Sequence, residues 1–255
     1  MSRSEGYKYS VVHLFIMFGV STFCLHDQPL PAALERIAAI TDFIEVMDEG
    51  LHALENAEPL ENYSSRFAIH APCRGTNIAS LLEPIRVASV EVIGQCFFVA
   101  ATVNAGVVVH PGYFAWAEER AKAQDRCKKS ISELKRLSDE FGVPFFIENM
   151  GDWDYFLLKT PDEMSLIGTT SFALDVGHAH QNRCLDRFLA YPAGHFHLHD
   201  NNGNEDSHLA VGDGTIDFIP VMDAVKRNGV APIIEVATFD GVIRSIEKLN
   251  AINAI

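Results

Sequence analysis

Histidine and acidic residues gather in three short stretches in the second half of the chain. Six of the eleven histidines lie between His178 and His208, where the sequence reads D-V-G-H-A-H at 175–180, H-F-H-L-H-D at 195–200 and D-S-H at 206–208. Neutral imidazole and carboxylate oxygen are ligands that proteins use together for zinc, manganese and iron. Packing of a protein core rarely produces histidine beside an acidic residue three times in one short segment. The pattern therefore predicts a divalent-metal site.

The composition limits the kind of partner. The chain has 255 residues, of which 48% are hydrophobic and 21% charged, and its formal net charge is −14. Because so acidic a surface repels nucleic acid phosphates, we expect a small-molecule substrate instead. The five cysteines form no C-x-x-C pair, which is typical of reduced thiols in a cytoplasmic protein. The oligomeric state, a homo-oligomer included, is left open.

The first residues differ from the rest of the chain. Residues 11–25 are largely apolar and follow Arg3 and Lys8, which faintly resembles a signal peptide, but no small-residue cleavage site follows cleanly. The stretch is also too short and too mixed for a membrane span. We therefore interpret residues 1–16 as an N-terminal extension, with Met17 as an alternative start, and residues 17–255 as one domain.

Short apolar runs alternate with helix-like segments along the whole chain. The runs are rich in Val, Ile and Phe and are continuous, as expected of strands covered on both faces. There are eight, at residues 18–25, 43–47, 67–71, 106–110, 143–148, 171–175, 195–199 and 232–236. Eight βα units predict a single-domain α/β fold, the (β/α)8 TIM barrel. A doubly wound open sheet is the alternative, although no glycine-rich turn follows the first run.

Local sequence signals predict where one helix ends and where another begins. Apolar side chains recur every three or four residues between Trp116 and Phe141, which predicts an amphipathic helix that ends at Gly142. Thr160 is followed by Pro161 and two acidic residues, so a second helix is expected to start there.

Potential ligands or acid–base groups stand at the ends of seven of the eight predicted strands. The active site of a TIM barrel lies at the C-terminal ends of its strands, so these side chains should meet at one rim. Any one of them alone is more often a surface or capping group, but seven at one rim favour a functional site. In chain order they are Glu45, His70, His110, Glu148, Asp175 with His178, His197, and Glu235.

These motifs resemble those of a known family. They are His-Ala-Pro at 70–72, Val-His-Pro-Gly at 109–112, Ile-Glu-Asn at 147–149, Asp-x-Gly-His at 175–178, His-x-His-Asp-Asn at 197–201, Asp-x-His at 206–208 and Ile-Glu at 234–235. The combination, from residue 18 to the last helix, is similar to the xylose isomerase-like TIM barrels. That superfamily joins sugar isomerases and epimerases to the endonuclease IV-type apurinic/apyrimidinic (AP) endonucleases, which are AP endonuclease family 2.

The resemblance to the isomerases and epimerases implies one divalent metal ion, Mn²⁺, Zn²⁺, Mg²⁺ or Co²⁺. Its ligands would fall on Glu148, Asp175, His197 and Glu235. The metal would act as a Lewis acid and stabilise the enediolate formed when a C–H proton leaves a small sugar or hydroxy-carbonyl substrate. Glu148 and Glu235 are then the candidate catalytic pair for proton transfer.

The same resemblance suggests which residues bind the substrate. Glu45 and His178 would orient it, while His110 and His70 would line the pocket. Trp153 lies in the loop after the fifth predicted strand, where it could form an apolar wall of the pocket or serve only as a core or surface anchor.

The resemblance to the endonucleases implies instead three zinc ions that activate water for phosphodiester cleavage. Two features count against it: Cys73 stands where those enzymes carry a tyrosine, and residues 26–30 contain no lysine or arginine for DNA. The distinction rests on Asp206 and His208, which a single metal does not need. The nine implied ligands are His70, His110, Glu148, Asp175, His178, His197, Asp206, His208 and Glu235.

Some histidines of these stretches belong to neither implied set of ligands. His195 and His199 share a face with His197 in a regular strand, and we interpret both as packed interior residues or as supports for a ligand. Gly212 and Gly214 favour a tight turn over a phosphate loop. A third, non-enzymatic interpretation is a barrel whose metal site serves sensing or structure.

Overall fold

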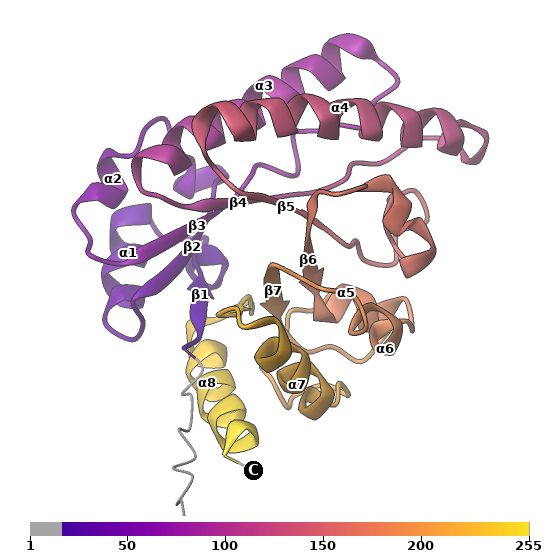
Figure 1. The fold of residues 1–255 in the computed structure, drawn as a ribbon. Coiled ribbons are helices and arrows are strands. Elements are labelled where there is room, and N and C mark those ends of the chain that lie inside the picture. Colours follow the sequence, from indigo (N-terminus) through magenta and orange to yellow (C-terminus); the bar gives the residue numbers. More distant parts are fainter. Residues whose placement is uncertain (1–16, 255) are drawn as a thin grey trace, which may run out of the picture.

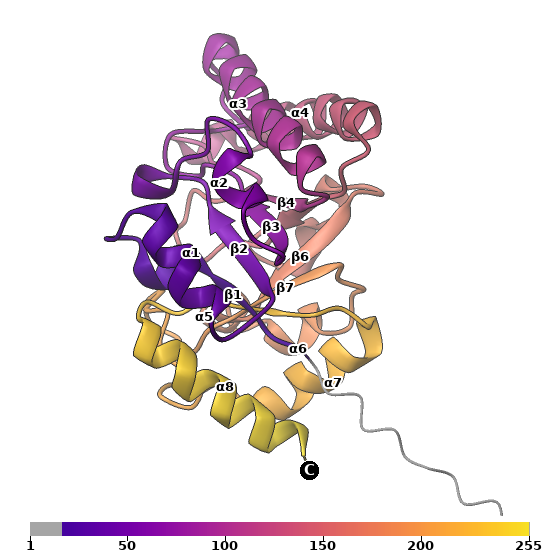
Figure 2. The ribbon, with the colours of Figure 1, turned by 90° about the vertical axis from the view of Figure 1, so that its left-hand side faces the viewer.

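The computed structural model describes residues 17–254, which form a closed barrel of eight parallel strands with helices around it (Figures 1 and 2). The strands are β1 (Gly19–Ser21), β2 (Phe43–Met47), β3 (Arg66–His70), β4 (Gly106–Val109), β5 (Phe145–Glu148), β6 (Ser171–Asp175), β7 (His195–Leu198) and β8 (Ile233–Ile234). They pair in chain order, and β1 closes the barrel against β8. This confirms the predicted TIM barrel and excludes the open sheet. The predicted extension, residues 1–16, lies outside the described residues.

Helices follow the strands and cover the outside of the barrel. Because the outer faces are covered and side chains fill the interior, all four residues of β7 are buried. The α-helices are α1 (Leu30–Ala38), α2 (Glu58–Glu61), α3 (Glu83–Thr102), α4 (Arg120–Phe141), α5 (Val176–Gln181), α6 (Leu185–Phe188), α7 (Phe218–Asn228) and α8 (Phe239–Asn253). Four short 3-10 helices are η1 (Thr22–Leu25), η2 (Gly50–His52), η3 (Ala117–Glu119) and η4 (Pro161–Leu166).

The apolar pattern overestimates the length of the first strand, whereas the start of η4 and the end of α4 lie where the sequence predicted helix ends. The first predicted strand, residues 18–25, stops at Ser21, whose hydroxyl accepts a hydrogen bond from the Phe23 amide (3.3 Å) and starts η1. A helix does start after Thr160, but it is the 3-10 helix η4. The helix α4 ends as predicted at Gly142, whose φ of 69° suits glycine.

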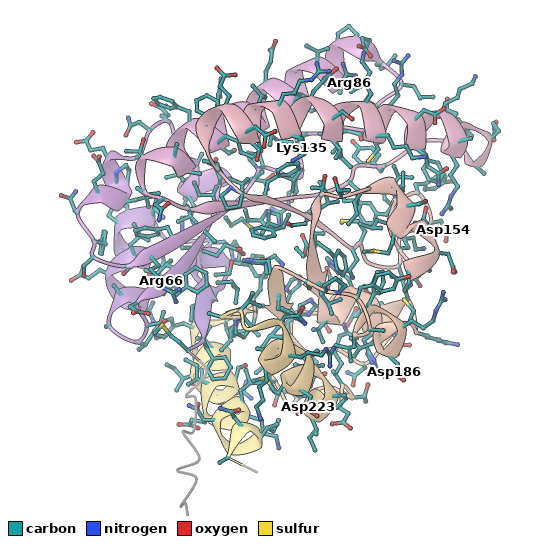
Figure 3. All side chains as sticks on the ribbon, in the orientation of Figure 1. Arg66, Arg86, Lys135, Asp154, Asp186 and Asp223 are labelled. Carbon is teal, nitrogen blue, oxygen red and sulfur yellow. The ribbon has the colours of Figure 1, made fainter. Side chains whose placement is uncertain are left out.

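The two longest helices, α3 and α4, pack together on one side of the barrel (Figure 1). By length and composition α3 could cross a membrane, but 44% of its apolar window is buried inside the protein. Its Arg86, labelled in Figure 3, is 2% exposed and lies 2.8 Å from Glu83 and 2.7 Å from Glu133. A buried guanidinium needs such partners, so this pairing ties α3 to α4.

Candidate metal centre

The ends of strands β5 to β8 bring four of the predicted ligands together. Glu148 and Asp175 end β5 and β6, His197 lies in β7, and Glu235 follows β8. The Glu235 amide still donates to the carbonyl of Leu198 (3.1 Å), which holds it beside β7. All four ligands are buried, and one ligand atom of each lies within 4.8 Å of those of the other three. We call Glu148, Asp175, His197 and Glu235 the central group.

His197 lies between the carboxylates of the central group. Its Nδ1 is 2.8 Å from Glu148 Oε1 and 3.4 Å from Glu235 Oε2. Its Nε2 is 2.9 Å from Glu45 Oε1, and the other Glu45 oxygen is 2.8 Å from His195. A carboxylate on the far nitrogen of a histidine orients the ring and leaves the near nitrogen for a metal. Glu45 is fully buried and lies behind His197, and its expected role in orienting a substrate stays a prediction.

Hydrogen bonds fix the orientation of Asp175. Its backbone N–H donates to Asn149 Oδ1 (2.8 Å), and Asn149 Nδ2 donates to the Asp175 carbonyl (2.9 Å). Its carboxylate accepts from the His178 amide (2.6 Å), which caps α5, and lies 3.0 Å from His199 Nε2. The His199 ring fits there because residue 177 is glycine, since a Cβ at Gly177 would lie 2.0 Å from it. His199 therefore supports a predicted ligand, as one interpretation of the sequence expected.

A second group lies where β3 and β4 end. His70 Nε2 is 3.3 Å and His110 Nε2 is 3.0 Å from the same oxygen, Glu148 Oε2. One ligand atom each of His70, Cys73 and His110 lies within 4.8 Å of the other two. We call these three residues the β3–β4 group. The sequence identified both histidines but treated Cys73 only as a departure from the endonuclease pattern, and its position three residues after His70 was the available signal.

A third group, the loop group, consists of His178, His199, Asp206 and His208. Asp206 Oδ2 is 3.1 Å from His178 Nε2 and 3.3 Å from His208 Nε2. The Nδ1 atoms of His178 and His208 donate to backbone carbonyls (2.9 and 2.7 Å), which leaves the Nε2 atoms facing the aspartate. The His199 ring stacks on His208 with centroids 4.0 Å apart. All nine residues implied for three metals thus fall into three adjoining groups.

Asp200 holds the loop that carries Asp206 and His208. The loop is a tight turn, as predicted, wrapped around a buried carboxylate. A Cβ at residue 214 would lie 2.3 Å from Asp200 Oδ1, so glycine is needed there. The carboxylate accepts four backbone hydrogen bonds of 2.9–3.1 Å, from Asn201, Gly212, Gly214 and Ile216.

Burial and close pairing shift the pKa values of these groups. Burial alone would lower the pKa of His70 and His208, but hydrogen bonds to carboxylates outweigh it and raise each pKa to about 9. Burial would raise the pKa of Glu148, yet His197 and His110 outweigh it and lower that pKa well below its ordinary value. Protons on histidines therefore balance the carboxylates of the metal-free protein, and a bound cation would take their place.

A cleft of about 480 Å³ opens beside the second and third groups and is lined in part by His110, His178 and Asp206. Trp153 lines the cleft too and is 47% exposed. Its ring packs against Phe156, with centroids 4.8 Å apart. Trp153 therefore forms part of an aromatic wall beside the candidate site.

Comparison with known proteins shows which family the chain belongs to. The family model described as xylose isomerase-like TIM barrel matches residues 37–252. The chain belongs to this family. An uncharacterized protein of Methanocaldococcus jannaschii, MJ1614, is 33% identical over 85% of this chain and 90% of its own length. A Mycobacterium leprae (strain TN) protein named "Probable endonuclease 4" is 29% identical over 66% of this chain and 72% of its own length.

Solved structures of other proteins share the fold. A D-tagatose 3-epimerase-like protein superposes with a TM-score of 0.84 at 28% identity and covers 92% of this chain and 96% of its own. The IOLI protein with a bound zinc atom superposes with a TM-score of 0.75 at 16% identity, over 93% of this chain and 98% of its own. At that lower identity the likeness shows the fold alone.

We expect D200N to loosen the loop that carries Asp206 and His208. An asparagine amide cannot accept from two of the four backbone N–H groups, and unpaired buried donors should cost about 2–4 kcal/mol. That corresponds to a fall in melting temperature of roughly 5–15 °C, measured by circular dichroism. D217N is the matched control, because Asp217 caps α7 at an exposed site where asparagine caps equally well. A D200N protein that melts within about one degree of wild type would contradict this role.

The stability of the metal-free protein should fall as the pH rises from 6.5 to 9. Histidines with a raised pKa stabilise the fold fully below their ordinary value of 6.5, and they lose that contribution as the pH passes through about 9, the pKa of His70 and His208. Metal-loaded protein should keep its melting temperature over this range, since a bound cation replaces those protons. An unchanged or rising melting temperature of metal-free protein between these two pH values would refute the pairing.

Proposed function

We propose that the protein is a divalent-metal-dependent isomerase or epimerase that moves a proton on a small sugar or hydroxy-carbonyl compound. The observation that carries the proposal is the convergence of Glu148 and Glu235 on one histidine, His197, at 2.8 and 3.4 Å. The two carboxylates come from β5 and from the end of β8, with β6 and β7 between them. A compound bound between them would meet an acid–base group on each of two sides.

The chemistry of the central group fits a divalent cation. Three carboxylates and one imidazole suit Mn²⁺, Mg²⁺ or Co²⁺, and Zn²⁺ accepts the same ligand types. Glu235 Oε1 is buried and has no hydrogen-bond partner among residues 17–254, a costly state unless something binds it. When bound, the cation would supply the positive charge that stabilises an enediolate.

The side chains at and around the central group would have different roles in proton transfer and substrate binding. The low pKa of Glu148, set by His197 and His110 against the effect of burial, keeps its carboxylate ionised at neutral pH and able to accept a proton from carbon. Glu235, carrying a proton when the substrate binds, would donate it to the opposite face of that carbon, which inverts it, or to the neighbouring carbon, which moves the carbonyl. Exchange with solvent would then remove the proton from Glu148 and restore the one on Glu235. His178 would bind substrate hydroxyls and Trp153 would cover the substrate.

The comparisons support a sugar substrate. The 28% identical structure is named for its likeness to D-tagatose 3-epimerase. A D-allulose 3-epimerase from Methylomonas, solved with D-allulose, has the same fold with a TM-score of 0.71 at 16% identity, over 88% of this chain and 84% of its own. A neutral sugar also agrees with a chain whose net charge is −14.

The double variant E148Q/E235Q tests the proton-transfer pair. Ketoses and aldoses are incubated with manganese-loaded protein in D₂O, and deuterium entering the carbon next to the carbonyl is followed by NMR. Loss of the two acid–base groups should lower the rate at least about 100-fold. E140Q is the control, because Glu140 is exposed on α4. Full deuterium incorporation by the double variant would eliminate this mechanism.

A specific observation favours a second candidate, a zinc-dependent phosphodiesterase like the AP endonucleases. The β3–β4 group and the loop group adjoin the central group, and Glu148 lies within 4 Å of residues of all three. Three cations at such spacing could activate water for attack on a phosphodiester. Against it, Arg74 is the one arginine or lysine of residues 17–254 that lines the cleft, and Asp152 and Asp206 line it too, a weak electrostatic match for DNA.

Abasic-site duplex DNA at low salt separates the two candidates, because electrostatic attraction is then greatest. Binding and strand cleavage by zinc-loaded protein would establish the hydrolase. Absence of both, together with deuterium exchange into a sugar, is the outcome expected here.

A further inference from the structure

A second cavity, of about 280 Å³, adjoins the cleft beside the candidate metal centre. The two share five lining residues, Cys73, Arg74, His110, Trp153 and Phe156. We call this cavity, which Thr76, Gly112 and Tyr113 also line, the side pocket. The cleft alone, at about 480 Å³, lies within the range of roughly 300–1,000 Å³ that is typical of small-molecule sites. The side pocket is therefore space beyond what a small sugar at the metal centre needs.

Aromatic rings form a wall of the side pocket. The ring of Trp153 packs against those of Tyr113 and Phe156, with centroids 5.6 and 4.8 Å away. The backbones of Tyr113 and Phe156 form an antiparallel bridge, and side chains of directly opposite residues in such a bridge lie on the same face. The loops after β4 and β5 thus present a joint apolar surface to the side pocket.

Hydrogen bonds hold the loops that form this wall. The Leu157 amide donates to the Gly112 carbonyl (3.2 Å). Asn77, in the loop after β3, donates to the Tyr113 carbonyl (2.9 Å) and accepts from the Tyr113 amide (3.1 Å). A Cβ at Gly112 would lie 2.5 Å from Asn77 Oδ1, so glycine is needed for this contact. The side pocket is formed before a ligand enters, which lowers the cost of ordering it on binding.

Several polar side chains of the side pocket already have partners. The Thr76 hydroxyl donates to a backbone carbonyl, and His110 Nε2 lies 3.0 Å from Glu148. The Arg74 side chain is 80% exposed and lies 3.9 Å from Glu49. A second sugar ring would leave hydroxyls unpaired here, which weakens binding. An apolar ring has no such groups and gains from contact with the aromatic wall.

We propose that the side pocket binds an apolar ring carried by the substrate, which is then a sugar or hydroxy-carbonyl compound with an aryl substituent. The reacting carbon would lie at the central group, a position that rests on the proposed function. His110 connects the two places, because it lines the side pocket and lies 3.0 Å from Glu148 of the central group. A compound that spans both would place its polar end at the carboxylates and its ring against Trp153.

Matched glycosides test the proposal by isothermal titration calorimetry of the manganese-loaded full chain. Phenyl and methyl β-glycosides of glucose and of galactose are compared, since each pair differs only in the apolar group. The phenyl compound should bind at least about tenfold more tightly, because burial of its ring removes apolar surface from water. Cellobiose, which carries a second sugar ring instead, should bind no more tightly than methyl glucoside. Equal affinities within each pair, absence of binding included, or cellobiose that matches phenyl glucoside, would overturn the assignment.

The variant Y113A tests the aromatic wall. It should reduce the preference for phenyl over methyl glycosides about fivefold, because one ring of the wall is lost. Tyr113 lines the side pocket and not the cleft, so the affinity for methyl glycosides should not change. Y191A is the matched control, because Tyr191 is exposed and precedes β7, at the opposite end of the barrel. An unchanged preference in Y113A would contradict the proposal.

A fluorescence measurement covers the case in which Y113A does not fold. The chain has two tryptophans, Trp116 and Trp153, so W116F leaves Trp153 as the reporter. Phenyl glucoside should protect Trp153 from quenching by acrylamide, and methyl glucoside should not. Equal quenching with the two glucosides would rule out a ring against Trp153. These experiments record binding and not turnover, so they can fail while deuterium exchange at the central group succeeds, and the reverse.

Discussion

Glu148 carries its carboxylate into the barrel with 1% of its side chain exposed, and histidines from β3, β4 and β7 lie 3.3, 3.0 and 2.8 Å from it. A buried charge without partners is too costly for a marginally stable fold. The strands that meet here must therefore supply positive charge, either as protons on His70 and His197, whose pKa values are raised, or as bound cations. The arrangement of the three groups follows from that requirement.

Support for these ligands comes from atoms that a substrate would never touch. Glu45 lies behind His197, and Asn149 fixes Asp175 through a pair of backbone–side-chain hydrogen bonds. The Asp200 carboxylate accepts hydrogen bonds from four backbone amides and so positions the loop that carries Asp206. His197 and Asp175 therefore have fixed orientations before any cation arrives, which is the usual condition for a precise metal site.

The sequence predicted most of the fold and which candidate ligands lie close together, because both depend on short patterns. Continuous apolar runs mark strands covered on both faces, and polar residues that end those runs must meet at one rim. What it could not predict depends on contacts between distant segments. The burial of Glu45 and the grouping of Cys73 with His110 arise from packing across the barrel. The early end of β1 arises from a single hydroxyl, that of Ser21.

The account depends most on whether the central group binds a divalent cation. The most direct measurement is a crystal structure of protein loaded with manganese, with anomalous scattering used to locate the metal. The account predicts manganese bound by Glu148, Asp175, His197 and Glu235. Metal that binds elsewhere, or a Glu148 carboxylate that touches no cation, would contradict it.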